Sequence, residues 1–215
     1  MSLASNFRSR CALVFVALAL AAPPAHAELV THTFTGQLTT ITNGSGVTAD
    51  LTGLFTLGQA VTLEYTIERT TAPTQQDAYT SAYTDAITAL TFTVGSWTGT
   101  GTPSSVTTVT DNAPSGGVNY DQYSAQIISG ITAPPLGSAM YQSLTYTLDD
   151  IQGTVFGSTA LPRVFPDLGV FEGKTMTVLL FDFTQLKAGY VMATLAGVAT
   201  PAQPQTWGRL KALYR

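Results

Sequence analysis

Two pairs of oxygen-bearing side chains flank a short loop of Gly, Pro and Ser in the middle of the chain. Asp111 and Asn112 precede the loop 113–117, and Asn119 and Asp121 follow it. Carboxylate and amide oxygens are the ligands that calcium prefers, and six to eight of them surround the ion. These four residues are therefore a candidate metal site that would take calcium. Their spacing matches no EF-hand, and an ordinary Asn/Asp turn is the alternative.

Aromatic residues on both sides of this loop form a candidate ligand-binding surface. Trp97 lies at the end of an expected strand, and Tyr120 and Tyr123 follow the acidic loop. An exposed Trp or Tyr presents an apolar ring and a polar tip, which suits the mixed surface of a sugar. Aromatic residues at strand spacing also form core or cross-strand pairs, which is the alternative for these three.

Few side chains in the sequence could act as nucleophile or base. The chain has one cysteine, Cys11, and two histidines, His26 and His32. Nucleophilic catalysis and zinc sites usually need more of these residues. Glu64 and Glu68 share one face of an expected strand, but their Cα atoms are about 13 Å apart at the rise of an extended chain. Glycoside hydrolysis needs two carboxylates about 5–9 Å apart. We therefore expect no catalytic site and no enzymatic activity.

Residues 1–27 have the pattern of a secretory signal peptide. Arg8 and Arg10 precede the apolar run 11–22, and Ala25-His26-Ala27 provides a small-residue cleavage site. The apolar run is too short to span a bilayer as a helix. We expect a secreted protein without a stable membrane anchor. Cleavage would remove Cys11 and His26, so the exported chain would hold no cysteine.

The charge of the expected exported chain excludes one class of partner. It keeps 7 basic and 13 acidic residues, a net charge of −6, and three of the basic residues lie in the last seven positions. An acidic body of this kind repels phosphate backbones, so we expect no binding to nucleic acid. Cations, neutral glycans and other proteins are compatible with it.

The composition and the alternation of residues predict an all-β fold. The chain holds 36 Thr, 19 Gly and 11 Pro, and only 10% of its residues are charged. Thr is β-branched and favours strands, whereas Gly and Pro favour the turns between them. We expect one domain over 28–199, a sandwich or jelly roll of about ten antiparallel strands. The predicted strands are 31–38, 51–57, 61–68, 78–84, 89–95, 106–110, 120–128, 143–149, 176–183 and 190–198.

Two of these segments differ from the others. Residues 176–183 and 190–198 are nearly continuously apolar, which predicts strands buried on both faces. Asp182 interrupts the first of them, and we expect it either to face solvent or to pair with Lys187 or Arg163. A turn is expected at 99–105, where Gly, Pro and Ser cluster.

Local patterns in the first half of the chain resemble the bacterial secreted PEP-CTERM proteins. The resemblance is carried by Thr31–Gly36, Gly53–Ile67 and Ala86–Gly95, and extends more loosely over the remainder. It implies a β-rich body and a place at the outer surface or in the exopolysaccharide matrix. That family ends in a Val-Pro-Glu-Pro-like motif, a membrane helix and a basic cluster. In the tail 200–215, Pro201 and Pro204 have no Glu between them and no apolar run follows, so the tail resembles a degenerate sorting signal.

Together these features favour a secreted, non-enzymatic surface or matrix protein. It would associate with extracellular polysaccharide or with matrix proteins through strand edges and aromatic faces. The alternative is a carbohydrate-active enzyme or a lectin-like carbohydrate-binding module on a jelly roll. A cluster of carboxylates and aromatic rings on one concave face would favour that alternative.

Overall fold

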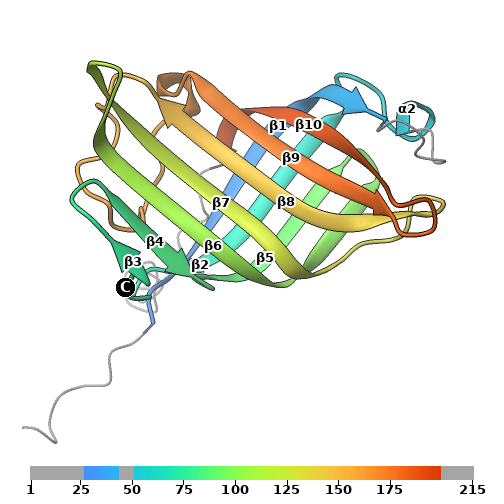
Figure 1. Ribbon diagram of the computed structural model, residues 1–215, viewed down its shortest axis with the longest axis horizontal. Helices are drawn as coiled ribbons and strands as arrows, with labels where there is room; N and C mark the ends of the chain where they lie inside the picture. The colour runs from blue at the N-terminus through green and yellow to red at the C-terminus, as the bar shows by residue number, and fades with distance from the viewer. Residues whose placement is uncertain (1–26, 44–50, 200–215) are drawn as a thin grey trace, which may run out of the picture.

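A computed structural model describes residues 27–43 and 51–199, and its strands close into a single barrel (Figure 1). The expected signal peptide, apart from Ala27, and the expected tail 200–215 lie outside the described residues. The strands are β1 (Leu29–Thr42), β2 (Ala60–Glu68), β3 (Gln75–Gln76), β4 (Thr80–Thr84), β5 (Ile87–Val94), β6 (Trp97–Ser115), β7 (Val118–Thr132), β8 (Ala139–Asp150), β9 (Gly173–Asp182) and β10 (Lys187–Ala199). Two short helices, α2 (Leu51–Leu54) and η1 (Leu168–Val170), lie in the connections.

The all-β class is confirmed, but the sandwich or jelly roll is wrong. Eight strands follow one another around the barrel in chain order, all antiparallel: β1, β2, β5, β6, β7, β8, β9 and β10. Pairing of β1 with β10 and of β6 with β7 closes the ring. The 19-residue β6 pairs with β5 through its first part and with β4 through its middle, so β3 and β4 extend the sheet as a short arm.

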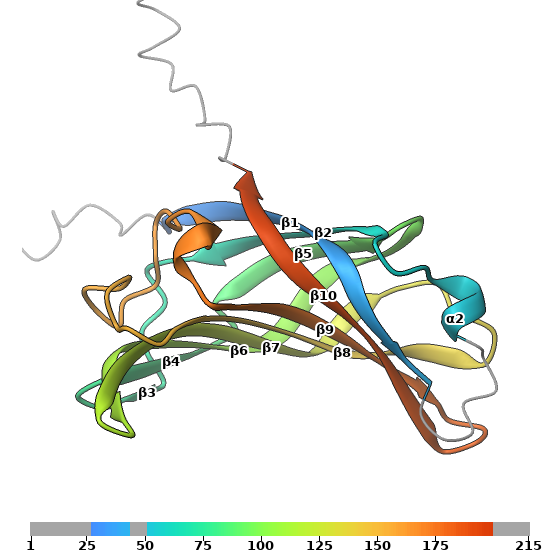
Figure 2. The ribbon, with the colours of Figure 1, turned by 90° about the horizontal axis from the view of Figure 1, so that it is seen from above.

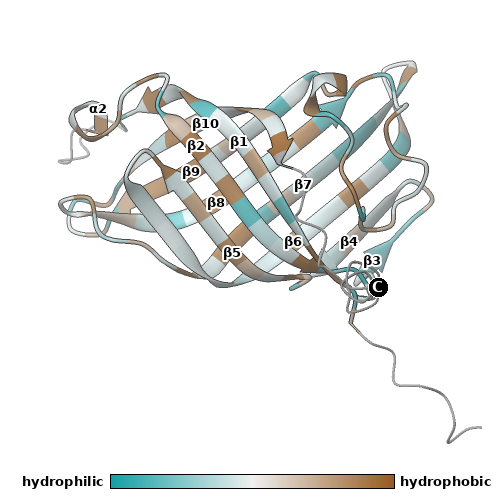
Figure 3. Cartoon of the chain, turned by 180° about the vertical axis from the view of Figure 1, so that it is seen from behind, coloured by the Kyte–Doolittle hydropathy of each residue, from teal (hydrophilic) through white to brown (hydrophobic). Residues whose placement is uncertain are grey.

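Alternating residues along each strand fill the barrel interior. Phe34 on β1, Leu63 on β2, Phe92 on β5 and Tyr146 on β8 are completely buried, while their sequence neighbours face outward. Side chains can fill an eight-stranded barrel completely, so the interior serves as the hydrophobic core. Figure 3 shows the resulting change between apolar and polar positions along the strands. Among the described residues, no helix has the length and apolar character needed to cross a membrane.

Three local expectations were wrong. Residues 51–57, expected as a strand, form α2 and the loop after it. The expected turn 99–105 lies inside β6. The apolar strands β9 and β10 bury one face only, because a barrel wall has one inner and one outer side; Phe183, just beyond β9, is 59% exposed.

The connections close the two ends of the barrel. At one end, the segment 151–172 between β8 and β9, here called the closing loop, covers the opening, and α2 lies at the opposite end (Figures 1 and 2). Phe165 of the closing loop is buried, with its ring edge-on to His32 and Tyr123 at centroid distances of 4.7 Å. The Tyr83 Oη donates to the Thr159 carbonyl (2.9 Å) and ties the loop to the arm, and Arg69, directly after β2, donates from Nε to the Leu161 carbonyl (3.0 Å).

Candidate functional site

The four expected calcium ligands are spread over a β-bulge. Asp121 is completely buried, and its two carboxylate oxygens accept hydrogen bonds from the backbone N–H groups of Asn112 (2.7 Å), Val155 (2.8 Å) and Phe156 (2.7 Å). Asp111 accepts a hydrogen bond from the Asn112 side chain, and Asn119 is exposed. In 27–43 and 51–199, no group of three or more His, Cys, Asp or Glu side chains could hold a metal ion. Asp121 thus anchors the closing loop to β7.

Asp150, the strand partner of Asp121, also holds the closing loop. Asp150 on β8 faces Asp121 across the sheet and is also buried. Burial would raise the pKa of Asp150, but hydrogen bonds from the backbone and side chain of Thr154 and the backbone of Gln152 outweigh it and lower that pKa below its ordinary value. Its carboxylate therefore stays ionised and holds the start of the closing loop.

Asp182, the acid within the apolar strand β9, is buried as well. Its carboxylate accepts hydrogen bonds from the Ser138 hydroxyl (2.6 Å) and from the backbone N–H groups of Thr184 and Gln185. It does not face solvent. Lys187 is its register partner on β10, and Arg163 instead forms an ion pair with Glu28 at 3.1 Å. Asp121, Asp150 and Asp182 each hold a connection between strands in place.

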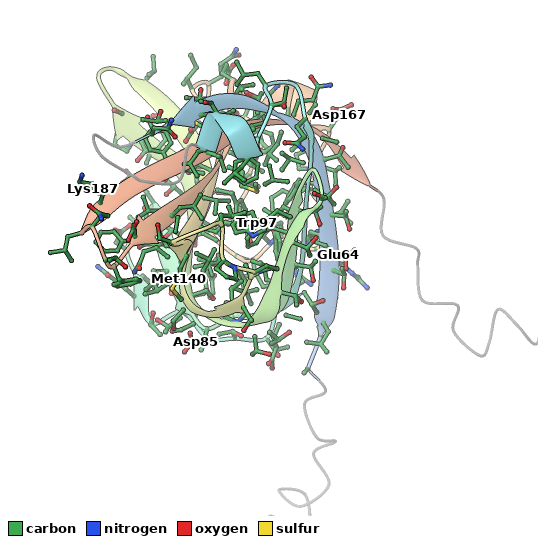
Figure 4. All side chains as sticks on the ribbon, turned by 90° about the vertical axis from the view of Figure 1, so that its right-hand side faces the viewer. Glu64, Asp85, Trp97, Met140, Asp167 and Lys187 are labelled. Atoms are coloured by element: carbon green, nitrogen blue, oxygen red, sulfur yellow. The ribbon has the colours of Figure 1, made fainter. Side chains whose placement is uncertain are left out.

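The three aromatic residues expected to bind a ligand do not share a surface. Trp97 is buried against Phe55 and Phe92, and Figure 4 shows it inside the ring of strands, with Glu64 on the outside. Tyr123 points into the core, whereas Tyr120 is half-buried at the opposite end of the barrel from Trp97. Trp97 and Tyr123 are core residues, which was the alternative to a ligand-binding role.

Replacing Trp97 with phenylalanine is expected to destabilise the fold moderately without unfolding it. The indole N–H donates to the Pro134 carbonyl at 2.8 Å, which joins β6 to the β7–β8 connection. Phenylalanine keeps most of the packing but leaves this carbonyl without its donor, at a cost of about 1–3 kcal/mol. Urea unfolding followed by circular dichroism measures the change. An equal stability of both proteins would contradict a structural role for the hydrogen bond.

Inside the barrel, three buried tyrosines bring their hydroxyl groups together. The Tyr65 hydroxyl donates to that of Tyr123 at 3.2 Å, and the Tyr146 hydroxyl lies 3.4 Å from the same oxygen. Burial raises the pKa of Tyr123 to about 12, so the group is neutral at physiological pH. Sequence reasoning missed this cluster, although each tyrosine occupies an inward position of an alternating strand.

A groove of about 380 Å³ lies on the outer face of β6, β7 and β8. Two rows of cross-strand neighbours form it: Thr108, Ser124 and Thr147 in one, and Val106, Gln126 and Thr145 in the other. Gln122 lines one end and donates to Asp149 at 2.7 Å. No Lys, Arg, Asp or Glu lines the groove, which presents hydroxyl and amide groups from three adjacent strands.

Comparison with known protein families, curated proteins and solved structures found no relative of this chain.

The groove differs from the threonine-rich face on β1, β2, β5 and the start of β6. There the hydroxyls bond to one another, as in Thr31–Thr66 (2.8 Å), Thr91–Thr100 (3.0 Å) and Thr93–Thr98 (3.2 Å). In the groove, Thr108, Ser124, Gln126, Thr145 and Thr147 make no side-chain hydrogen bond to another described residue. Their hydroxyl and amide groups face solvent and are available to a ligand. The outward threonines of an alternating strand could have indicated this surface, but not which of them pair.

Proposed function

We propose that the protein is a secreted, non-enzymatic binding protein for neutral polysaccharide. The observation that carries the proposal is the groove on β6, β7 and β8, which is lined by uncharged hydroxyl and amide side chains. Because it runs across three strands on the outside of a closed barrel, a polymer can cross it without its ends entering the protein.

The chemistry of the groove matches that of a neutral glycan. Hydroxyl and amide groups both donate and accept hydrogen bonds, as sugar hydroxyls do. Val106 supplies an apolar contact in one of the two rows. The acidic charge of the chain disfavours acidic polymers by repulsion.

The state of the carboxylates favours binding over hydrolysis. Glycoside hydrolysis needs a carboxyl group with a raised pKa as general acid. The pKa of the buried Asp150 is lowered, and the carboxylates of Asp121 and Asp182 are occupied by backbone hydrogen bonds within the fold. This observation argues against the alternative of a carbohydrate-active enzyme. A lectin-like module, which binds a sugar without cleaving it, does not need such an acid.

The location of the protein belongs to the same proposal. The signal-peptide pattern at 1–27 and the resemblance to PEP-CTERM proteins support export to the cell surface or extracellular matrix. A neutral polysaccharide is a natural partner in such a place. Calcium forms no part of the proposal, because Asp121 is committed to the closing loop.

Binding to soluble polysaccharides tests the proposed function. We expect saturable binding to at least one neutral polymer among dextran, a mixed-linkage β-glucan and a galactomannan, and none to alginate. The triple variant Gln126→Ala, Thr145→Ala, Thr147→Ala should weaken binding more than tenfold, since each lost hydrogen bond is worth about 1 kcal/mol. Affinity electrophoresis, or calorimetry for the tightest polymer, gives the constants.

The matched control is Thr91→Ala with Thr93→Ala on the opposite face, where the hydroxyls bond to each other. This variant should bind the polymer like the parent protein. Equal loss in both variants, or no binding to any neutral polymer, would overturn the proposal.

A further inference from the structure

Large apolar side chains gather on the outer wall where the β9–β10 turn meets the start of β8, at the end of the barrel opposite the closing loop (Figures 1 and 2). Strand register places Met140 on β8, Phe181 on β9 and Ala188 on β10 in one row across the three strands. In the turn, the Phe183 ring lies edge-on to that of Phe181 at a centroid distance of 4.8 Å. We call the following residues the apolar corner: Met140, Phe181, Phe183, Leu186 and Tyr190.

The exposure of the apolar corner is high for side chains of this kind. Leu186 is 76% exposed, Phe183 is 59% exposed and Met140 is 51% exposed. Apolar side chains that are exposed singly are ordinary on a protein surface, whereas a contiguous group of them marks an interaction site. The apolar corner is such a group.

The backbone of the turn adds a second cost at Leu186. Its φ is 53°, in the left-handed region that glycine and asparagine adopt readily and leucine rarely does. Asp182 holds the turn in place by accepting hydrogen bonds from the backbone N–H groups of Thr184 and Gln185. A leucine that is both exposed and strained is not explained by the stability of the fold. Strain of this kind is tolerated where a function needs the side chain.

The end of the barrel that carries the apolar corner is uncharged over its described connections. No Lys, Arg, Asp or Glu occurs in the connecting segments 51–59, 95–96, 133–138 and 183–186. Lys187 directly follows the turn, and Figure 4, which looks onto this end, places it at the rim. The closing-loop end is acidic instead and holds Asp121, Asp150, Asp167 and Glu172. The molecule can therefore present its uncharged end to a surface while its acidic end stays in water.

We propose that the apolar corner docks reversibly on a zwitterionic lipid surface, with Phe183 and Leu186 entering the boundary between headgroups and acyl chains. Apolar side chains gain free energy there in proportion to the area that they bury. Lys187, beside them, can pair with a lipid phosphate, and the amphipathic ring of Tyr190 suits the headgroup level. A second copy of the chain is a poorer occupant, because a two-fold contact through this turn would bring two Lys187 ammonium groups together. The apolar corner shares no residue with the groove and does not depend on glycan binding.

Flotation with phosphatidylcholine vesicles tests the proposal on the exported protein, residues 28–215, which contains every described strand. The expected signal peptide is left out because its apolar run 11–22 would bind lipid by itself. We expect the protein to float with the vesicles, also at roughly 1 M salt, where attraction between charges is screened. Leu186→Asn should weaken partitioning about tenfold, since it removes the most exposed side chain of the apolar corner. The same variant should be at least as stable in urea, because asparagine accepts the left-handed conformation.

The matched control changes two exposed valines at the acidic end, Val118 and Val164, to serine. This control should float like the parent protein. Absence of flotation, an equal loss in both variants, or flotation that survives Phe183→Ser combined with Leu186→Asn would each overturn the proposal. Self-association in solution that Leu186→Asn abolishes, without vesicle binding, would also overturn it and assign the apolar corner to a second copy. Polysaccharide binding should be the same in the parent protein and in Leu186→Asn, so the two proposals fail separately.

Discussion

Replacing Asp121 with alanine will cost about 4 kcal/mol of the free energy of unfolding, a large effect for one substitution. The carboxylate accepts three backbone hydrogen bonds, from Asn112, Val155 and Phe156, and is completely buried. Alanine leaves these N–H groups without an acceptor, and each unpaired buried group costs about 1–3 kcal/mol, with water recovering part of the loss. Urea unfolding of both proteins at pH 7 measures the difference.

Asp111→Ala is the control, because Asp111 is half-buried and the hydrogen bond found for its side chain comes from the adjacent Asn112. We expect a change below about 1 kcal/mol for this variant. Hydrogen exchange should also show faster exchange of the Val155 and Phe156 amides in Asp121→Ala. Similar losses in both variants would show that Asp121 does not anchor the closing loop.

Lowering the pH from 7 to 5 will destabilise the protein by about 2 kcal/mol through His32 alone. Burial lowers the pKa of this histidine from 6.5 to about 4, and the nearby Arg69 charge acts in the same sense. Between these two values the unfolded chain binds a proton that the folded chain does not. Stability is therefore complete above the unfolded pKa and is lost as the pH falls toward the folded pKa.

His32→Phe isolates this contribution. Phenylalanine fits a site lined by Tyr65 and Phe165 and carries no proton, so most of the stability difference between pH 7 and pH 5 should disappear. The absolute stability at pH 7 can change by about 1 kcal/mol, because the hydrogen bond between the His32 ring and the Pro162 backbone is lost. Unfolding curves at both pH values decide the matter. An unchanged pH dependence in the variant would show that other groups cause it.

Local patterns could predict the strands but not their closure. The alternation around Leu63 and Tyr65 fixes which side of β2 is buried, whatever sheet the strand joins. A sandwich and a barrel differ in which distant strands pair, here β1 with β10, and no local pattern records that. Gly99 and Gly101 led us to expect a turn, but they lie inside β6 because a side chain would not fit at either position. An added Cβ at Gly99 would meet the Phe92 ring, and one at Gly101 would meet the Gly130 carbonyl, so both glycines permit close packing inside β6.

For the candidate site residues too, the sequence could predict local neighbours but not contacts from distant segments. Asp111 and Asp121 lie on the same bulged strand pair, on either side of the loop that they flank in the sequence. The sequence could not show that amides from Val155 and Phe156, over thirty residues away, reach Asp121. Nε2 of the buried His32 has no hydrogen-bond partner among the described residues, which depends on what the closing loop places beside it. Such properties arise from long-range contacts.

Closure of the barrel also limits how copies of this protein can aggregate. Strands rich in Thr and Val and poor in charge are prone to stack into cross-β fibrils when their edges are open. Here each of the eight wall strands has a partner on both sides, and the outermost edge of the arm is the two-residue β3. A chain with such a composition can therefore stay dispersed at high local concentration while folded. The sequence suggested association through strand edges, but the strands of the barrel wall have no free edge. Assembly through the wall would therefore use its outward side chains.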